Sequence, residues 1–351
     1  MTTKLTSTTI PLIILLTLSI LIISACSPQA EITTDPPPTE LPEATSTKAV
    51  EPTAVEPTVE VIDTPVPQPT QEQITVIDGS DREVTLAEPA QKIVSLAPSN
   101  TEILFAIGAG EQVIGRDEFS DYPSQAADLP SVGGGFGDYN LEAIVDLEPD
   151  LVLAAEINTP EQVKALEDLG LTVFLLSNPI SLDEMFENLL TVAELTAHIP
   201  EAEDLVDTLR SRVSKVESVI ESVENQPTVF YELDATDPSA PWTAGSGTFI
   251  DTLITMAGGE NIASDMEGQY LQFSIEELLI RDPQVIILGD AAYGITPESL
   301  LDRTGWSNIS AVVNDRIYTF DDNLVSRPGP RLVDGLEQLA ISLHPELSPD
   351  N

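Results

Sequence analysis

The chain has 351 residues, which is long enough for two lobes or domains that each bury a core. Its 14 Lys and Arg residues against 59 Asp and Glu residues give a formal net charge of −45; such a field repels a phosphate backbone, which argues against a nucleic-acid partner. One cysteine and two histidines leave no internal disulfide, no Cys-rich zinc site and few of the groups that catalytic triads and metal hydrolases require.

The chain begins with the pattern of a signal peptide. Lys4 precedes an apolar run over residues 10–23, which is shorter than the roughly 20 residues that a membrane-spanning helix needs. Residues 23–26 (ISAC) resemble a bacterial lipobox, in which the cysteine is acylated and the chain is cut before it. We therefore predict a signal peptide over residues 1–25 and lipid attachment at Cys26, which would anchor the protein on the extracytoplasmic face of the cell membrane. An uncleaved anchor and a chance cysteine are the alternatives.

Residues 26–72 have the composition of a disordered tether. The segment contains ten prolines among Thr, Glu, Val and Ala, and it shows neither a helical nor a strand period. As a coil, a segment of this length has a root-mean-square reach of about 37 Å. We expect it to hold a folded body away from a membrane. A proline-motif ligand for a binding module is the alternative.

After the tether, short apolar strands alternate with helices. A hairpin-like stretch over residues 74–86 comes first, and a buried strand over residues 92–96 follows it. A helix is expected to begin just after this strand, with Ser99 or Asn100 as its cap and Glu102 favouring the first turn through the helix dipole. The pattern indicates an α/β fold, with further strands at residues 113–115, 151–154 and 171–176.

An internal repeat divides the rest of the chain into two similar lobes. Residues 140–153 reappear as residues 274–287, at a constant offset of 134. Each copy has a capping residue, a glutamate two positions later, an apolar helical stripe, a proline that ends the helix, and a strand. We therefore predict one α/β lobe over residues 73–180 and a second over residues 226–351.

The segment 181–225 is expected to connect the lobes as a backbone helix. It is broken only at Ile199-Pro200, and from there the apolar residues recur every three or four positions up to Val223. A helix of about 25 residues is a rod of roughly 37 Å. We therefore predict that one long helix joins the lobes, with its apolar stripe packed against the core.

Seven short motifs carry a resemblance to a known family. They lie at residues 92–104 (KIVSLAPSNTEIL), 119–126 (FSDYPSQA), 140–142 (NLE), 148–152 (EPDLV), 242–245 (WTAG), 258–262 (GGENI) and 327–331 (RPGPR). In combination they resemble the helical-backbone substrate-binding proteins of ABC importers, the receptors for cobalamin, ferric siderophores and haem. The resemblance extends over about residues 73–345.

The resemblance implies a fold and a role. The fold is two similar α/β lobes with central parallel-type sheets, joined by one long rigid helix. The role is a monomeric receptor that captures its ligand between the lobes, outside the cytoplasm, and delivers it to a permease dimer with its ATPase. The ligand is expected to be a metal chelate or a corrinoid, and no bond is broken.

The resemblance also implies which residues meet these partners. One glutamate on each lobe, Glu142 and Glu276 by position, is expected to contact arginines of the permease, although helix-dipole stabilisation alone would also explain them. Aromatic residues line the cleft of the cobalamin-binding relatives, and Ala155 stands where one of them is absent. The expected ligand-binding residues are Phe119, Phe136, Tyr139, Trp242, Tyr270 and Arg327, with Tyr293 and Asn323 as further loop candidates. Arg327 is suited to an anionic ligand group, and ordinary loop packing is the alternative for each aromatic residue.

Two other classes of function were weighed. The glycines at residues 108–110, 133–135 and 245–247 match neither a nucleotide-binding motif nor a nucleophile elbow. His198 and His344 each lie within two residues of a proline and are interpreted as helix-end residues. We therefore expect a protein that is not an enzyme, with no catalytic residue, no metal site and no intrinsic cofactor. A lipid-tethered acidic adhesin or structural surface protein is the alternative function.

Overall fold

The computed structural model describes residues 73–135 and 137–347, and these described residues group into one compact unit. Within the described part of the chain, no helix is both long enough and apolar enough to cross a membrane. Four expectations lie outside the described residues: the signal peptide (1–25), the tether (26–72), Cys26 and Phe136.

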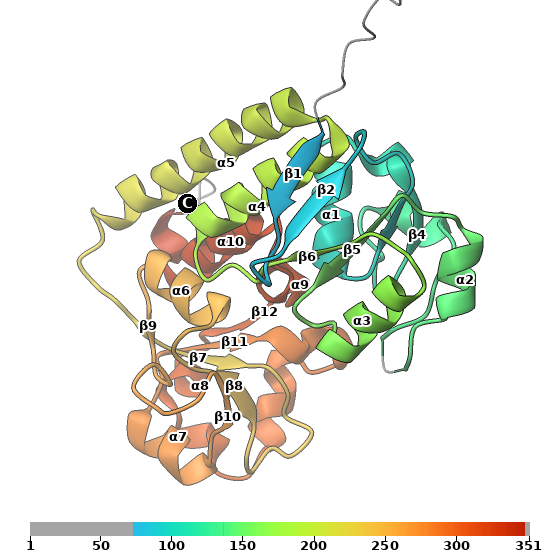
Figure 1. Ribbon diagram of the computed structural model, residues 1–351. Coiled ribbons are helices and arrows are strands. Elements are labelled where there is room, and N and C mark those ends of the chain that lie inside the picture. The colour runs from blue at the N-terminus through green and yellow to red at the C-terminus, as the bar shows by residue number, and fades with distance from the viewer. Residues whose placement is uncertain (1–72, 136, 348–351) are drawn as a thin grey trace, which may run out of the picture. The chain divides into compact units, whose positions relative to one another are not determined.

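The N-terminal lobe is built around a parallel sheet with the strand order β4-β3-β5-β6 (Figure 1). Strands β3 and β5 are apolar and buried along their whole length, as expected for the centre of a parallel sheet that is covered on both faces. The antiparallel hairpin β1–β2 precedes the sheet, as the sequence indicated. The strands span Ile74–Ile77 (β1), Glu83–Leu86 (β2), Ile93–Ser95 (β3), Val113–Arg116 (β4), Leu151–Ala155 (β5) and Val173–Leu176 (β6). The helices span Pro98–Ala106 (α1), Leu141–Asp146 (α2) and Pro160–Asp168 (α3).

The C-terminal lobe repeats this arrangement with the strand order β12-β11-β7-β9, again parallel. An additional antiparallel hairpin pairs β8 with β10. The strands span Thr228–Glu232 (β7), Trp242–Ala244 (β8), Glu260–Asn261 (β9), Tyr270–Gln272 (β10), Val285–Leu288 (β11) and Ile317–Thr319 (β12). The helices span Phe249–Met256 (α6), Ile275–Arg281 (α7), Ser310–Val313 (α8), Asn323–Ser326 (α9) and Leu332–Leu343 (α10).

The repeat found in the sequence is present in the structure. Leaving the β8–β10 hairpin aside, both sheets place their first strand between the second and the third, with the fourth strand outside the third. Asn140 Oδ1 accepts a hydrogen bond from the backbone N–H of Ala143 at 3.0 Å, and Ser274 Oγ accepts one from Glu277 at 3.1 Å. Both predicted caps are therefore confirmed. Glu148 and Asp282, which precede the two repeated prolines, both have positive φ angles (50° and 45°).

The expected cap of α1 is wrong. The helix begins at Pro98, and its N-cap, Ala97, makes no side-chain capping bond. Proline is favoured at the first helical position because it has no N–H to satisfy, so Ser99 and Asn100 fall inside the first turn. Asn100 is buried there, and its Nδ2 donates to the carbonyls of Leu153 and Ala154 at the end of β5.

The segment 181–225 contains two helices, α4 (Leu182–Thr196) and α5 (Ile199–Ile220). The break lies at Ala197, which ends α4 in a left-handed conformation with φ 62°, just before the position that the sequence indicated. Helix α4 packs against α1 and β1, so it is part of the N-terminal lobe. Helix α5 is the connecting helix: it packs against both α4 and α10, and the chain passes from its end to β7 (Figure 1).

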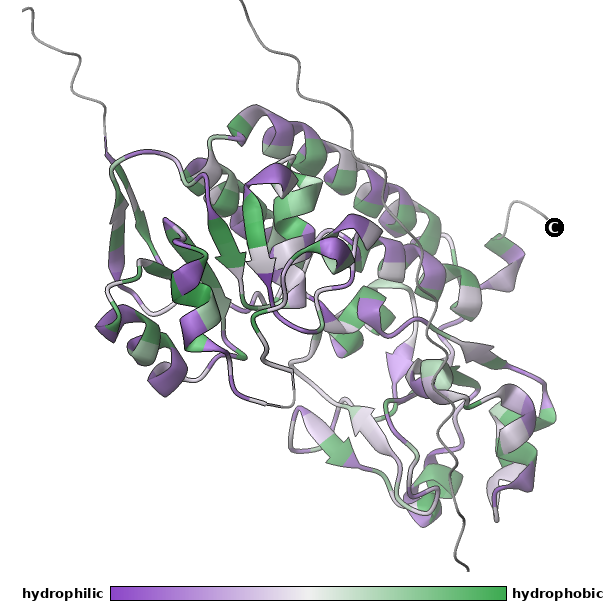
Figure 2. Ribbon diagram, turned by 90° about the vertical axis from the view of Figure 1, so that its right-hand side faces the viewer, coloured by the Kyte–Doolittle hydropathy of each residue, from purple (hydrophilic) through white to green (hydrophobic). Residues whose placement is uncertain are grey.

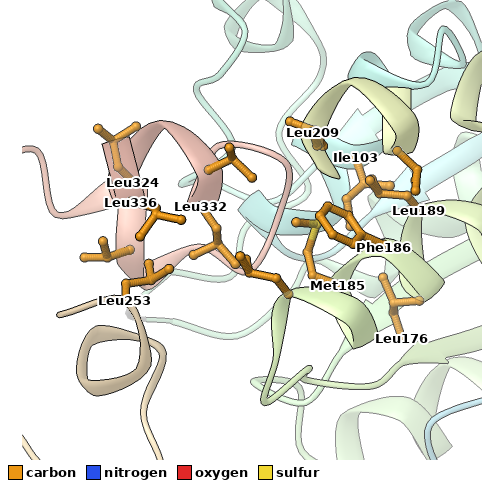
Figure 3. Close-up of a cluster of buried hydrophobic side chains, with 14 of the residues drawn as sticks. Ile103, Leu176, Met185, Phe186, Leu189, Leu209, Leu253, Leu324, Leu332 and Leu336 are labelled. Atoms are coloured by element: carbon orange, nitrogen blue, oxygen red, sulfur yellow. The ribbon is translucent and has the colours of Figure 1, made fainter. Parts of the chain in front are cut away.

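The two lobes share one continuous apolar core. It contains Ile103 of α1, Phe186 of α4 and Leu209 of α5, and it continues into Leu253 and Leu332 of the C-terminal lobe (Figure 3). Figure 2 shows hydrophobic residues along the N-terminal strands, with helices around them that carry both hydrophobic and hydrophilic residues. Separation of the lobes along α5 would expose this core to water, which favours a nearly fixed relation between them.

Candidate ligand-binding cleft

A cavity of about 440 Å³ lies between the lobes. Each of the four parallel strands of the N-terminal sheet contributes residues from the loop at its carboxyl end, where ligands commonly bind in α/β sheets. The C-terminal lobe supplies the opposite wall from β10 and from the loop before α10. The N-terminal lining consists of residues 97–100, Phe119, residues 155–157 and residues 176–178, with Asn188 of α4; the C-terminal lining consists of Tyr270 and residues 326–328.

The two aromatic residues that line this cavity come from opposite lobes. Phe119 lies on the N-terminal side, and Tyr270 lies on the C-terminal side with 60% of its surface exposed. Trp242 does not line the cavity. It lies on the same face of the β8–β10 hairpin as Tyr270, since Trp242 pairs with Gln272 and Tyr270 pairs with Ala244.

Tyr139 has a structural position beside the cleft. Its hydroxyl donates to the carbonyl of Leu96 at 2.9 Å and accepts from Asn158 Nδ2 at 2.7 Å. Burial raises the pKa of Tyr139 to about 12. Gly134 makes room for the ring, because a Cβ atom there would lie 2.5 Å from it. Tyr139 therefore fastens the loop around residue 158 to the end of β3 and is not part of the cavity wall.

Arg327 lies in the cleft wall, but its guanidinium is already shared by two carboxylates. Its Nη1 is 3.2 Å from Glu102 Oε1 and 2.6 Å from Asp121 Oδ1, both in the N-terminal lobe. Arg331 binds the same Glu102 carboxylate. The sequence indicated Arg327 for an anionic ligand and Glu102 for the helix dipole. The structure places Arg327 in the cleft wall and also pairs it with Glu102 across the lobes.

The other polar side chains that line the cavity are mostly neutral, and the sequence analysis did not predict them as ligand-binding residues. Asn188 Nδ2 donates to the carbonyl of Ser177 at 2.9 Å, and Asn178 and Glu156 lie at the ends of the neighbouring loops. No motif marks these residues. For Asn178 and Glu156 the available signal was their position just after a predicted strand, because the carboxyl ends of parallel strands meet at one edge of the sheet. Asn188 lies within α4 and had no such signal.

The corresponding strand ends of the C-terminal sheet hold buried charges. Glu232, the last residue of β7, binds Arg303 through both of its carboxylate oxygens at 2.5 and 2.8 Å. Asp290 follows β11, and its Oδ2 accepts from the backbone N–H of Ala235 at 3.2 Å. Burial, and to a lesser extent the negative charge of nearby Glu232, raises the pKa of Asp290 to about 7. Asp322 follows β12 and accepts from the hydroxyl of Tyr231 at 2.9 Å.

Glu142 and Glu276 occupy equivalent exposed positions on the first turns of α2 and α7. One turn later, each helix exposes an aliphatic side chain: Val145 is 40% exposed and Leu279 is 38% exposed. These two residues are also 134 positions apart. Each lobe therefore presents the same pair, an acid with an apolar neighbour on the same helix face.

Comparison with known proteins decides the family. The profile described as periplasmic binding protein matches residues 93–324, more than half of the chain. The chain belongs to the periplasmic binding protein family. It is 32% identical over 278 residues to a protein of Bacillus subtilis named as an uncharacterized ABC transporter substrate-binding lipoprotein, YvrC (78% of this chain, 86% of that protein). It is also 32% identical over 256 residues to the vitamin B12-binding protein of Vibrio cholerae (73% of this chain, 90% of that protein).

Solved structures agree with this assignment. The periplasmic vitamin B12-binding protein BtuF of Vibrio cholerae superposes with a TM-score of 0.63 at 31% identity, covering 73% of this chain and 97% of that one. The periplasmic haem-binding protein RhuT of Roseiflexus sp. RS-1 superposes with a TM-score of 0.66 at 28% identity, covering 73% and 98%. The expected fold of two α/β lobes is thereby confirmed.

The matched region of this periplasmic binding protein, 93–324, contains both parallel sheets and the N-terminal half of the cleft. The hairpin β1–β2 and helix α10 lie outside it. Among the residues that the structure describes, no group of three or more His, Cys, Asp or Glu side chains is placed to hold a metal ion.

Proposed function

We propose that this periplasmic binding protein is the extracytoplasmic receptor of an ABC importer that captures a metal chelate or corrinoid between its lobes. The observation that carries the proposal is the cavity of about 440 Å³, which has Phe119 on one lobe and Tyr270 on the other. Its size lies within the usual range for small-molecule sites. Large flat ligands gain contact area and stacking energy from two opposed aromatic rings.

The candidate ligands are cobalamin, a ferric siderophore and haem. Relatives named for vitamin B12 and for haem binding share the fold and are 28–32% identical to this chain over the aligned residues. The polar lining is mainly amide and hydroxyl groups, including Asn178, Ser177 and Asn188, and the cation that borders the cavity, Arg327, is paired with Glu102 and Asp121. This lining favours a ligand that is held by area and neutral hydrogen bonds over one that is held by a strong negative charge.

Delivery requires docking to the permease, and we propose Glu142 and Glu276 for this contact. Each is exposed on the first turn of a short capped helix, which holds the carboxylate on a rigid element. Val145 and Leu279 add an apolar contact beside each acid. A receptor that presents the same pair twice suits a dimeric permease with two arginine clusters, because charge-assisted hydrogen bonds then form on both lobes.

The membrane location rests on the sequence before residue 73. We propose that Cys26 carries the lipid and that residues 26–72 tether the receptor. Cys26→Ser should move the protein from the membrane fraction to the soluble fraction or leave it unprocessed, and both outcomes are read by fractionation and gel migration. A Cys26→Ser variant that fractionates and migrates like the wild type would contradict the anchor.

The ligand is identified by direct binding. The purified protein is incubated separately with cyanocobalamin, haemin and a panel of ferric siderophores, and binding is read by the absorbance of the retained fraction and by calorimetry. We expect one class to bind with one ligand per protein. Retention of none of them would contradict the receptor function and favour the surface adhesin.

A further inference from the structure

A buried carboxylate of the N-terminal lobe is held by two arginines of the C-terminal lobe. The side chain of Glu102, on α1, is 1% exposed. Arg331 donates to it through Nε (2.8 Å to Oε2) and Nη2 (2.5 Å to Oε1), and Arg327 Nη1 lies 3.2 Å from Oε1. The partners are 225 and 229 residues apart in the sequence.

Two neighbouring side chains of the N-terminal lobe complete the arrangement. The guanidinium of Arg331 lies 4.0 Å from the centre of the Tyr122 ring, which is within the range of a cation–π contact. Asp121 accepts from Arg327 at 2.6 Å. We call Glu102, Asp121, Tyr122, Arg327 and Arg331 the interlobe clasp.

The segment between the two arginines rests on α1. A Cβ atom on Gly329 would lie 3.6 Å from the carbonyl oxygen of Ser99 and 3.9 Å from Glu102 Cβ, so the loop packs closely against the first turns of the helix. The same loop forms part of the cleft wall through Arg327 and Pro328. The position of the clasp therefore decides where this wall of the cleft lies.

The clasp is difficult to open. A carboxylate removed from water is stable only while it is paired and hydrogen-bonded, and removing one partner of a buried pair leaves an uncompensated charge. Arg331 makes a bidentate contact, which adds geometric specificity. The contact between Arg327 and Asp121 differs, because the Asp121 side chain is 65% exposed and water can replace it as a partner.

We propose that Glu102 is the positioning residue of the cleft: by holding Arg327 and Arg331 it fixes the C-terminal wall against α1 and sets the width of the ligand cavity. The proposal rests on the proposed function only in taking this cavity as the ligand site. When the lobes move during ligand capture, they rotate about the interlobe clasp. The contact between Glu102 and Arg331 stays intact during this movement, and the contact between Arg327 and Asp121 changes.

The chain contains a matched control. Glu232 and Arg303 also form a buried bidentate pair, with side chains 0% and 7% exposed, but both belong to the C-terminal lobe and neither lines the cleft. Glu102→Gln and Glu232→Gln each remove one charge from a buried pair without changing the side-chain size. A general loss of stability should therefore affect the two variants alike, whereas a loss of cleft geometry should affect only Glu102→Gln.

The test measures amide hydrogen exchange of the full-length, ligand-free protein. In Glu102→Gln we expect amide exchange to accelerate by at least about tenfold both in residues 98–104 and in residues 327–335. Both segments should respond because the ion pairs of Glu102 with Arg327 and Arg331 hold them together. In Glu232→Gln we expect acceleration confined to the C-terminal lobe, around residues 228–232 and 299–306. Acceleration of a single lobe in Glu102→Gln, or no acceleration, would overturn the proposal.

A second readout concerns the cleft itself. Cyanocobalamin, haemin and ferric siderophores serve as probes, and the dissociation rate of the probe that the wild type retains should rise by at least about tenfold in Glu102→Gln and change by less than about twofold in Glu232→Gln. An unchanged dissociation rate in Glu102→Gln would also overturn the proposal. If the wild type retains no probe, the proposed function fails, and hydrogen exchange still decides the clasp.

A milder pair of variants covers the case in which Glu102→Gln does not fold. Arg331→Lys keeps the charge but loses the bidentate geometry, and Arg331→Gln loses both. We expect the exchange of residues 98–104 to rise in the order wild type, Arg331→Lys, Arg331→Gln. Equal exchange in all three proteins would contradict a positioning role for this contact.

Discussion

The two lobes have the same strand order and the same capped helix before their third strand, yet they use the carboxyl ends of their sheets differently. In the N-terminal lobe, all four strand ends open into the cavity between the lobes. In the C-terminal lobe, the equivalent strand ends are filled by Glu232, Asp290 and Asp322 with their partners. The topology thus provides the place for a site, and the side chains at the strand ends decide whether a site forms there.

The residue types explain this difference. Ser99, Ser177 and Asn178 are short and neutral, so the segments that carry them leave room for a cavity. Buried carboxylates require partners, and Arg303 and the hydroxyl of Tyr231 fill the space beside them. The C-terminal lobe therefore reaches the cleft with its β8–β10 hairpin and the loop before α10, not with its sheet.

The strongest effect is expected for Glu142 and Glu276, the exposed acids on the first turns of α2 and α7 that both lobes share. Glu142→Arg combined with Glu276→Arg should reduce ligand uptake to the level seen without the receptor while leaving ligand affinity unchanged, because both arginine contacts become repulsive. Uptake by cells and binding to the purified protein are measured side by side. Each single variant should retain part of the uptake if the lobes contribute independently.

Charge reversal elsewhere is the control for docking. Asp128→Arg combined with Glu217→Arg changes the net charge equally at exposed positions on other elements, and it should alter neither uptake nor affinity. Normal uptake by the double variant of Glu142 and Glu276 would show that these acids only stabilise their helices. Loss of ligand affinity in that variant would assign them to the cleft.

The next effect concerns Asp290, a buried acid at a strand end of the C-terminal sheet. An unfolded Asp loses its proton near pH 4, but folded Asp290 has a pKa of about 7. Between these values the folded state binds more protons, so the free energy of unfolding falls as pH rises, by at most about 4 kcal/mol from this group. Asp290→Asn should remove this slope and make the protein more stable than the wild type at pH 8.

Denaturant unfolding at pH 5 and pH 8 measures this effect. Asp128→Asn, at an exposed position, should keep the wild-type slope. Asp117 in the N-terminal lobe also has a pKa raised by burial, so Asp117→Asn should reduce the slope in the same direction. An Asp290→Asn protein with the wild-type difference between the two pH values would exclude Asp290 as its source.

A smaller effect compares the two aromatic walls of the cleft. Tyr270→Ala and Phe119→Ala should each weaken ligand binding by about 1–3 kcal/mol, or roughly 5- to 150-fold, if the ligand lies between the rings. Trp242→Ala should weaken binding less than Tyr270→Ala, because Trp242 shares the hairpin face but does not line the cavity. Calorimetry with the identified ligand gives these values.

Tyr293 provides the matched aromatic control, since it is 89% exposed and does not line the cavity. Tyr293→Ala should leave the affinity within about twofold of the wild type. Unchanged affinity in both Tyr270→Ala and Phe119→Ala would remove this cleft as the binding site.

The smallest effect tests the equivalence of the repeats. Asn140→Ala and Ser274→Ala each remove one capping hydrogen bond, and each should lower the free energy of unfolding by about 1 kcal/mol. Denaturant unfolding of the two variants measures this directly. If only one of the two variants has a lower free energy of unfolding, the two equivalent caps do not contribute equally to stability.

Much of the fold was predictable because local rules decide it. The alternation of strands and helices, the hairpin at residues 74–86, the caps at Asn140 and Ser274, and the apolar stripe of α5 follow from periodicity and from capping chemistry. The error at α1 was also local in origin: two good capping residues directly follow Pro98, and the preference of proline for the first helical position prevailed.

The cleft was less predictable than the fold. Phe119, Tyr270 and Arg327 were identified through resemblance and do line the cavity, although Arg327 is also paired with Glu102. Tyr139 does not line the cavity, and its hydroxyl binds the carbonyl of Leu96. A tyrosine in a loop looks the same in the sequence whether its hydroxyl meets a ligand or a neighbouring carbonyl. The distinction depends on what occupies the space next to the ring.

The acidic character of the chain, its two α/β repeats and the helix that connects them can be recognised from the amino-acid sequence alone, because composition and short-range periodicity express these features directly. The pairing of Glu102 with Arg327 and Arg331, more than 200 residues away, becomes visible only in the folded chain. The same holds for the difference between the two sheet edges, one of which opens into a cavity while the other is filled. The physical reason is that burial, which makes a charge costly and a contact specific, is a property of the folded chain and not of any local segment.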